Sequence, residues 1–266
     1  MKTFVFLDLD GTFWMHQVIP ASALRAVERA RANGNLIFIN TGRARSSAMP
    51  TLEGIPVDGF CFSAGSEIWL DGRQLFFHPF GTEKTKRIMK WLSDHDIAFG
   101  PEGTHQSFGT TEYCDFLQSH FEQNRITDGT LHLHNAAGMT EDDLGKIMKF
   151  SICLKEGQNL DELLEQEELE FTPFGVSFGE GLMSGELSDR SLTKATAMEV
   201  VRAKVDPTAR TLAIGDSEND IPMIKGADVG ICMGNGTTAA KEAADWITDT
   251  IDNDGLAKAF EKAGLI

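Results

Sequence analysis

The chain has 266 residues, of which 41% are hydrophobic and 24% are charged, as in an ordinary soluble globular protein. This length allows one large domain or two of modest size. The formal net charge of −16 argues against nucleic acid or an anionic membrane surface as a partner. A phosphate-bearing ligand would therefore need local positive charge, from a metal ion or from a few placed Lys and Arg side chains.

Cysteine usage and the first residues indicate the compartment. The chain has 4 cysteines, far apart and without a C-x-x-C pair, so we expect reduced thiols rather than a disulfide framework or a zinc site. A strand pattern begins almost at once, with no charged-then-apolar leader, and no apolar run approaches membrane-spanning length. We predict a cytoplasmic protein that does not enter a membrane. The cysteines are Cys61, Cys114, Cys153 and Cys232.

Two carboxylates follow the first predicted strand. Residues 4–7 form a short apolar run rich in β-favouring side chains, typical of a strand buried on both faces of a parallel sheet. The run leads into Asp8 and Asp10 and then into a turn at Gly11-Thr12. These residues would lie at the carboxyl end of the strand, and ligands bind at the carboxyl ends of the strands in open α/β sheets. Taken alone, D-x-D-G-T could equally be a strand-end turn with solvated acids.

Helices and strands alternate through residue 77, which is typical of a doubly wound sheet. The second strand ends in Asn40-Thr41-Gly42-Arg43. Asp71-Gly72 between two apolar runs predicts a hairpin. The expected elements are a helix over 20–32, strands over 36–39 and 59–63, and hairpin strands over 68–70 and 75–77.

The pattern changes near residue 80 and returns at about residue 189. Between these points short strands and helices interleave, which favours a separate α+β module with an antiparallel sheet. We therefore predict an α/β protein with a doubly wound, mostly parallel, Rossmann-like sheet core from 1–80 and 189–266, and an inserted α+β domain from 81–188. In the insert we expect helices over 83–95, 111–122, 140–147 and 160–168, and strands over 106–108, 131–133, 150–154, 170–172 and 176–178; after it we expect helices over 192–204 and 219–225, strands over 212–214 and 229–232, and two terminal helices.

Polar groups thus follow three predicted strands. They are Asp8 and Asp10, then Thr41, then the segment 216–220 (D-S-E-N-D), with Lys194 near the start of a helix. A cluster of oxygen ligands suits Mg²⁺, and a Thr hydroxyl, a lysine and backbone N–H groups suit phosphate oxygens. Each feature has an ordinary alternative, namely a helix cap at Thr41, a surface lysine at Lys194 and a polar loop at 216–220. Their joint occurrence in this order favours a metal-assisted phosphate site.

Four segments of the sequence together resemble the motifs of the haloacid dehalogenase superfamily. They are D-L-D-G-T (8–12), N-T-G-R (40–43), the helix-borne Lys194 and G-D-S-E-N-D-I-P-M (215–223). The long insertion resembles the cap of the Cof-type, C2-capped branch (class IIB) of small-molecule phosphatases. The resemblance covers essentially the whole chain, and it implies that 81–188 is a substrate-specificity cap.

The resemblance also implies a role for each site residue. Asp8 would be the nucleophile that forms an aspartyl-phosphate, and Asp10 would be the general acid and later the base. Asp8, the main-chain carbonyl of Asp10, and Asp216 would hold Mg²⁺. Asp8 should stay ionised, whereas Asp10 must hold a proton near neutral pH and is expected to do so only in the closed complex. The implied phosphate-binding residues are Gly11, Thr41, Gly42, Arg43, Lys194 and Asn219, with Ser217 and Asp220 in support.

Two positions depart from the usual pattern of the family. Many relatives carry Asn-Gly after the third strand, where this chain has Ala64-Gly65, and the lysine is commonly followed by Gly rather than Ala195. Neither change touches the acids. Candidate leaving-group contacts in the cap are not distinguished from ordinary surface or core side chains, and three phenylalanines (Phe108, Phe116 and Phe121) are expected in the cap core. The candidates are His105, His120, Arg125, His132, His134 and Glu180.

The leading interpretation is Mg²⁺-dependent hydrolysis of a small phosphorylated metabolite, such as a sugar phosphate, a nucleotide or a phosphorylated cofactor. The protein would act as a monomer or homodimer on this small phosphate ester, with no nucleic-acid or membrane partner. A sugar phosphomutase of the same superfamily is an alternative, as is a non-catalytic phospholigand-binding protein. The presence of both Asp8 and Asp10 weakens the last alternative, because a scaffold without activity could lose either residue.

Overall fold

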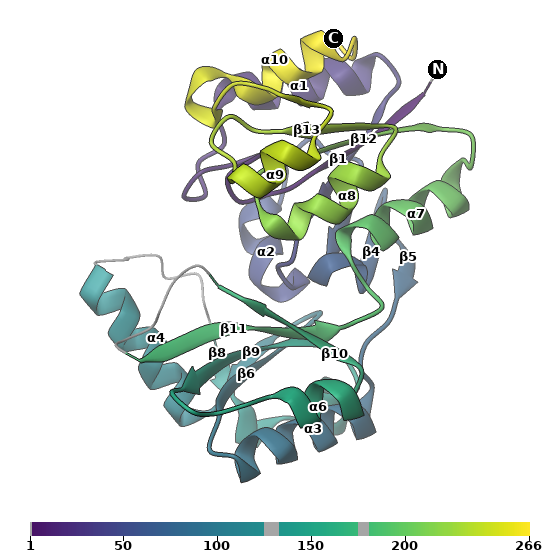
Figure 1. Cartoon of the computed structure of the whole chain (residues 1–266). Helices are drawn as coiled ribbons and strands as arrows, with labels where there is room; N and C mark the ends of the chain where they lie inside the picture. The colour runs from purple at the N-terminus through teal and green to yellow at the C-terminus, as the bar shows by residue number, and fades with distance from the viewer. Residues whose placement is uncertain (1, 125–132, 175–180) are drawn as a thin grey trace. The chain divides into compact units, whose positions relative to one another are not determined.

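The chain divides into two compact units, each described here by itself (Figure 1). The first, the core unit, comprises Met1–Arg43, Thr51–Phe77 and Leu192–Ile266, and the second, the insert unit, comprises Ala44–Pro50 and His78–Ser191. The computed structural model describes residues 2–124, 133–174 and 181–266.

The core unit is built on an eight-stranded sheet with the order β14-β13-β12-β1-β2-β3-β4-β5, among the described residues. Neighbouring strands are parallel from β14 through β3, and β4 and β5 add an antiparallel hairpin. This confirms the predicted α/β class with a mostly parallel sheet. The strands are β1 (Thr3–Leu7), β2 (Leu36–Asn40), β3 (Gly59–Phe62), β4 (Glu67–Leu70), β5 (Arg73–Phe77), β12 (Arg210–Gly215), β13 (Val229–Cys232) and β14 (Trp246–Ile247).

Helices cover the core sheet and bury its apolar side chains. Phe6 and Phe38 stack with ring centroids 5.1 Å apart, in one cluster with Met198 and Val201 of α7. The strand β1 is buried along its whole length, as its apolar run predicts. Helices α1 and α10 lie side by side (Figure 1). The helices of the core unit are α1 (Ala21–Ala32), α7 (Lys194–Val205), α8 (Ile221–Gly226), α9 (Thr238–Ala243) and α10 (Gly255–Lys262). Most of α2 (Arg45–Leu52) belongs to the segment Ala44–Pro50 of the insert unit.

The insert unit contains a six-stranded sheet with the order β10-β11-β9-β6-β7-β8, in the part that the structure describes. Its pairs are antiparallel except β7 with β8, so it is the α+β module expected from the sequence. Its elements are α3 (Thr82–Asp94), β6 (Ala98–Gly103), β7 (Ser107–Gly109), α4 (Thr111–Asn124), β8 (Leu133–Asn135), α5 (Glu141–Leu144), β9 (Ile147–Lys155), α6 (Asp161–Gln166), β10 (Leu169–Pro173) and β11 (Leu182–Asp189).

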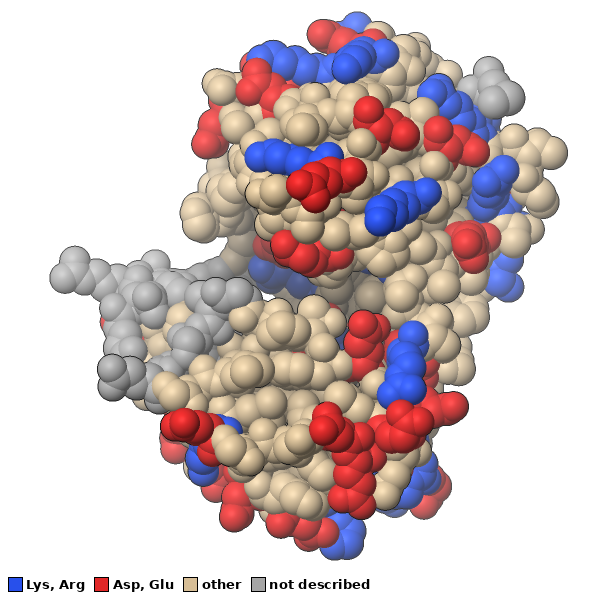
Figure 2. All heavy atoms as spheres, in the orientation of Figure 1, with Lys and Arg blue, Asp and Glu red and all other residues tan. Residues whose placement is uncertain are grey.

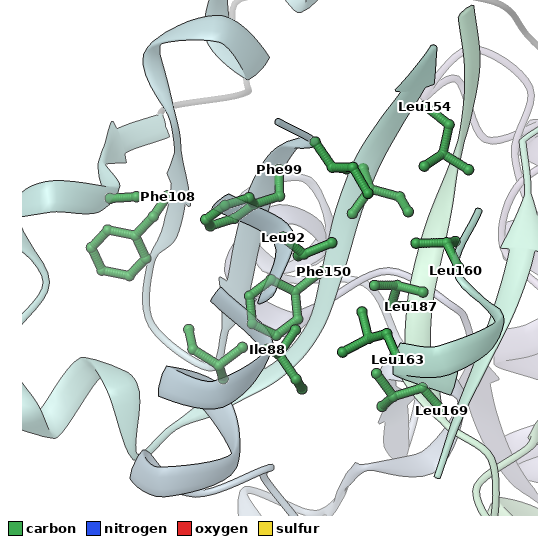
Figure 3. Packing of buried hydrophobic residues seen from close by; sticks show 14 residues of the cluster. Ile88, Leu92, Phe99, Phe108, Phe150, Leu154, Leu160, Leu163, Leu169 and Leu187 are labelled. Carbon is green, nitrogen blue, oxygen red and sulfur yellow. The ribbon is translucent and has the colours of Figure 1, made fainter. Parts of the chain in front are cut away.

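The two faces of the insert sheet differ in chemistry. Alternate residues of β9 point to opposite faces, and Phe150 packs with Ile88 of α3 and Leu163 of α6 in an apolar cluster (Figure 3). The other face carries Lys149 and Ser151 and is partly covered by α4. The expected core positions Phe108, Phe116 and Phe121 are confirmed, because each belongs to or packs against an apolar cluster of this unit.

One expected element of the insert was wrong, and two strands were missed. The helix expected over 140–147 ends at Leu144, and Ile147 instead opens β9. Strand β6 was missed because Gly100 and Pro101 are unfavourable in strands, yet Tyr113 packs where a side chain at residue 100 would lie. Strand β11 was also missed, and the strand expected over 176–178 lies outside the described residues.

Two further findings concern the cysteines and the helices of the described residues. All 4 cysteines are free thiols. No helix there has both the length and the apolar character that crossing a membrane requires.

Candidate active site

Charged side chains of both signs are interspersed on the face of the molecule shown in Figure 2. The sequence as a whole has more acidic than basic residues. A phosphate group would therefore need individual cationic side chains to bind it. Two such side chains lie beside the acids that follow β1, namely Arg43 beside Asp10 and Lys194 beside Asp8.

Three carboxylates converge at the carboxyl edge of the core sheet. Asp8 follows β1, and Asp216 follows β12, and these strands pair in parallel with Leu7 opposite Ile214. Asp8, Asp216 and Asp220 each place an oxygen within 4.8 Å of the others. Residues distant in the sequence therefore form one acidic cluster because their strands are neighbours.

Lys194 inserts its ammonium group into this cluster. Its Nζ donates to Asp8 Oδ1 at 2.5 Å, to Asp220 Oδ1 at 2.6 Å and to Asn219 Oδ1 at 3.3 Å. The side chain is buried at the first residue of α7, which is capped by the hydroxyl of Thr193. Burial alone would lower the pKa of Lys194, but the charges and hydrogen bonds of Asp220 and Asp8 raise it above its ordinary value. Lys194 therefore stays protonated.

Asp220 organises the loop after β12. Its Oδ2 accepts the backbone N–H of Asp216 at 2.8 Å and of Ser217 at 3.0 Å, while its Oδ1 accepts from Lys194. The Ser217 hydroxyl donates to Asn219 Oδ1 at 2.8 Å. Both oxygens of Asp220 are thus engaged within the loop and with Lys194, and the supporting role that the resemblance implies for Ser217 and Asp220 stays a prediction.

The other two acids of the cluster, Asp8 and Asp216, both have raised pKa values. Burial, followed by repulsion from Asp220, raises the pKa of Asp216 to about 6. Burial and Asp220 likewise raise the pKa of Asp8 well above its ordinary value, although Lys194 opposes the change. Crowded, buried carboxylate oxygens are the donor set that a hard divalent cation prefers. The residues present therefore fit Mg²⁺.

The turn after Asp8 is shaped around Asp216. Thr12 is buried, and its hydroxyl donates to Asp216 Oδ1 at 2.9 Å. Gly11 has φ +86°, and a Cβ at this position would lie 2.5 Å from Asp216 Oδ2. Residue 11 therefore needs glycine for both its backbone conformation and its closeness to an acid of the cluster.

The side chain of Asp10 is not one of the three clustered carboxylates and has its own partners, Arg43 and Trp14. Arg43 donates to it twice, from Nε to Oδ2 at 2.8 Å and from Nη2 to Oδ1 at 2.9 Å, and Trp14 Nε1 donates to Oδ1 at 2.9 Å. Partial burial raises the pKa of Asp10, but the hydrogen bonds and charge of Arg43 and the bond from Trp14 outweigh it, so the pKa is lowered. In this structure Asp10 is an ionised carboxylate, and its protonation in a closed complex stays a prediction.

The turn after β2 is tied to the end of β3. Thr41 is buried, and its hydroxyl accepts the N–H of Arg43 at 3.1 Å. The N–H of Ser63 donates to the carbonyl of Arg43 at 2.8 Å, and that of Ala64 donates to the carbonyl of Thr41 at 3.0 Å. Ala64 has φ 52° and ψ 27°. The segment 41–43 is thus fixed to the residues that follow β3, while residue 64 holds a left-handed conformation that favours Asn or Gly.

Sequence reasoning assigned no role to two residues of the site, although one of them, Asn40, stands in the N-T-G-R segment. Asn40 is buried and donates from Nδ2 to the carbonyl of Lys194 at 2.8 Å, so it links β2 to α7. The signal in the sequence that could have indicated a role for Asn40 is that a polar residue ends an otherwise apolar strand. Trp14 lies in the turn four residues after Asp10, between the apolar residues Phe13 and Met15, and the indole N–H that reaches Asp10 could not be inferred from this spacing.

The structure thus brings most of the expected site residues to one edge of the core unit. Asp8, Asp216, Asp220, Lys194 and Asn219 form one connected group. His105, His120 and His134 belong to the insert unit, whose placement against the core unit is not described. The candidates Arg125, His132 and Glu180 lie outside the described residues.

Comparisons with a family model and with individual proteins indicate the same family. The model of a family described as haloacid dehalogenase-like hydrolase matches residues 5–260. The chain is 29% identical over 260 residues to 5-amino-6-(5-phospho-D-ribitylamino)uracil phosphatase of Bacillus subtilis, covering 96% of this chain and 93% of that protein. These matches confirm the resemblance inferred from the motifs.

Solved structures show the same fold. A phosphatase of the haloalkanoate superfamily from Bacteroides thetaiotaomicron superposes with a TM-score of 0.81 at 23% identity, covering 100% of this chain and 96% of the other. A sugar phosphatase of subclass IIB superposes with a TM-score of 0.77 at 22% identity, covering 100% of both chains. At these identities the likeness concerns the fold.

Proposed function

This chain belongs to the haloacid dehalogenase-like hydrolase family, and we propose that it hydrolyses a small phosphate monoester with Mg²⁺ as cofactor. The observation that carries the proposal is the buried group of Asp8, Asp216 and Asp220 with the ammonium of Lys194. This group offers a carboxylate nucleophile and a cation beside it. Both are needed where an anion must approach an anionic phosphate.

Asp8, Asp216 and the main-chain carbonyl of Asp10 would hold the metal. Asp220 is the weaker candidate ligand, because its oxygens are already engaged by Lys194 and by backbone N–H groups. When bound, Mg²⁺ would supply positive charge against the phosphoryl oxygens and would keep the buried carboxylates ionised.

In the first step an oxygen of Asp8 attacks phosphorus while the ester oxygen leaves. The carboxyl proton of Asp10 passes to that oxygen, so the products are an alcohol and an aspartyl-phosphate. Lys194, the hydroxyl of Thr41, the backbone N–H of Gly42 and the side chain of Arg43 would hold the phosphoryl oxygens, with Gly11 and Asn219 at the rim of the site. Holding this group in line with Asp8 is the main contribution of the protein.

In the second step water attacks phosphorus and releases Asp8. Asp10, now a carboxylate, accepts the proton from the water, and inorganic phosphate leaves. The lowered pKa of Asp10 beside Arg43 suits this second role. The acid role requires that Arg43 release Asp10, which a bound phosphoryl group would favour by offering Arg43 another anion.

The names of the relatives favour an alkyl phosphate of a sugar or polyol as the substrate. One relative is a phosphatase of a phosphoribityl-amine compound, and one structural neighbour is a sugar phosphatase. The insert unit (81–188 by the sequence, as a cap) would select the leaving group. In such a substrate the leaving alcohol is a poor leaving group, so protonation by Asp10 matters most.

A screen of the purified protein against phosphorylated metabolites, with Mg²⁺ and with a chelator, tests the proposal. We expect Mg²⁺-dependent release of phosphate, and a loss of roughly 10³-fold or more in kcat for Asp8→Asn. Asp252→Asn, an exposed acid outside the site, serves as the matched control and should retain activity. Undiminished turnover by Asp8→Asn would refute the assigned nucleophile.

A further inference from the structure

We propose that Trp14 is a positioning residue for Asp10, and that its indole N–H orients the carboxyl group that protonates the leaving oxygen. The inference rests on the proposed function and adds to it a residue that acts through Asp10. Trp14 Nε1 donates to Asp10 Oδ1 at 2.9 Å.

The indole is a rigid partner. Trp14 is 1% exposed, which makes it one of the largest fully buried side chains of the described residues. Its backbone N–H donates to the carbonyl of Leu9 at 3.0 Å, and its carbonyl accepts the N–H of Gly11 at 2.8 Å. The backbone of Trp14 is therefore bonded to the residue before Asp10 and to the residue after it. The indole N–H and the Asp10 carboxylate belong to one small, fixed unit.

Arg43 is a different kind of partner. Arg43 binds both oxygens of Asp10, but the side chains of Arg43 and Asp10 are 36% and 52% exposed, so a bound anion can compete for this guanidinium. Arg43 is also among the residues proposed to meet the phosphoryl group, so its contact with Asp10 can be exchanged for one with substrate. The bond from Trp14 remains when this happens.

The chemistry of the indole suits a positioning role. An indole N–H is a donor only, so Trp14 can hold Oδ1 of Asp10 but cannot take the proton of Asp10. Arg43 Nε occupies Oδ2 at 2.8 Å in this structure. Once Arg43 leaves, Oδ2 is the oxygen that can carry the proton to the ester oxygen, while the bond at Oδ1 prevents the carboxyl group from rotating.

Trp14→Phe tests the inference, because it keeps an aromatic ring and removes the N–H. The probes are phenyl phosphate and 4-nitrophenyl phosphate, two similar esters of which only the first has a strongly basic leaving group. We expect kcat/KM for phenyl phosphate to fall about 10-fold and that for 4-nitrophenyl phosphate to change less than about 2-fold, since general acid catalysis helps a poor leaving group most. The parameter kcat/KM is chosen because it reports the step in which the leaving group departs.

Trp69→Phe is the matched control. Trp69 Nε1 also donates to a carboxylate, Glu67 Oε1, at 2.7 Å, but it lies on the hairpin strand β4. This variant should leave the ratio of the two esters unchanged. In an Asp10→Asn background, Trp14→Phe should no longer change that ratio, because the group through which it acts is gone.

Several outcomes would overturn the inference. An equal loss on both esters would indicate a merely structural role, and no loss on either would indicate that the N–H is dispensable. If Trp14→Phe does not fold, 3-benzothienylalanine at position 14 keeps the two-ring shape and replaces the N–H by sulfur, and the same ratio decides. Absence of wild-type turnover on both esters would instead refute the proposed function, and the inference with it.

Discussion

Gly11 shows how one residue can serve both the backbone and the acidic cluster. It combines a left-handed φ of +86° with a distance of 2.5 Å between a hypothetical Cβ and Asp216 Oδ2. The second constraint is specific to the site, because it would displace a proposed metal ligand. A left-handed φ alone is common among the glycines of this chain.

Gly11→Ala and Gly34→Ala separate the two constraints. Gly34 has φ +88° with nothing within 4 Å of a Cβ, so its replacement should cost only the backbone strain of about 1 kcal/mol in the free energy of unfolding. We expect Gly11→Ala to show at least this loss and, in addition, weaker Mg²⁺ binding by calorimetry. Equal Mg²⁺ affinity for the two variants would contradict the close approach of residue 11 to Asp216.

The raised pKa of Asp216 predicts how pH changes metal-free stability. Because burial and Asp220 raise it to about 6 in the folded chain, from about 3.9 when unfolded, the folded state binds more protons between these values. The metal-free protein should therefore become less stable as the pH rises from about 4 to 6 through this group. Thermal unfolding with a chelator measures this contribution as the difference between wild type and Asp216→Asn.

Mg²⁺ should reverse that trend. Metal binding needs ionised carboxylates, so the rise in Tm on adding Mg²⁺ should be larger at pH 7.5 than at pH 5. A Mg²⁺ effect on Tm that is the same at both pH values, or that is kept in Asp216→Asn, would count against this site.

At the scale of elements, the contact between β2 and α7 fixes the position of Lys194, the lysine proposed to bind the phosphoryl group. Asn40 is buried and donates to the carbonyl of Lys194, the residue that begins α7. The strand and the helix are far apart in the sequence, and this bond ties the helix start to the sheet edge where Asp8 lies. The position of Lys194 thus depends on a strand residue that has no proposed chemical role.

Asn40→Ala should lower both stability and activity. We expect a loss of about 1–3 kcal/mol in the free energy of unfolding, since a buried hydrogen bond is removed, together with a lower kcat. Asn33→Ala is the control, because Asn33 Nδ2 donates to the carbonyl of Leu265 at the same 2.8 Å but is exposed and lies outside the four motifs. Chemical denaturation and steady-state kinetics measure the two variants, and an unchanged kcat for Asn40→Ala would argue against this link.

The elements that could be predicted from the sequence are those with one strong local pattern. The buried run of β1 and the Asp71-Gly72 hairpin were correct, and the structure gives these two residues φ values of 47° and 73°, as a tight hairpin turn requires. Strand β6 could not be predicted, because Gly100 and Pro101 hide a strand that is stabilised by pairing with β9. Tertiary pairing outweighs local preference there.

At the scale of the whole molecule, the acids of the site could be predicted because the order of strands is simple. Strands β12, β1 and β2 are neighbours in a parallel sheet, so residues that follow them must lie at one edge. The partners of Asp10 could not be predicted in the same way. They depend on side-chain directions within the loop, which place Trp14 and Arg43 on the same carboxylate.

The whole molecule also joins two units with separate cores. The core unit carries the acids, Lys194 and the turn at Thr41, and the insert unit buries its own apolar cluster around Phe150 (Figure 3). The chemistry can therefore be assigned within the core unit, and the choice of leaving group is proposed for the insert unit. This division explains why a reaction class can be assigned from the core unit before a substrate is known.

The most direct test of the account is to locate the phosphoryl group during turnover. The enzyme, mixed with Mg²⁺ and 4-nitrophenyl phosphate and quenched in acid within the first turnovers, should carry a phosphoryl group on the peptide that contains Asp8, as read by mass spectrometry. The label should be absent in Asp8→Asn. A phosphoryl group found on another residue, or phosphate released at the full rate from Asp8→Asn, would contradict the central claim that Asp8 is the nucleophile.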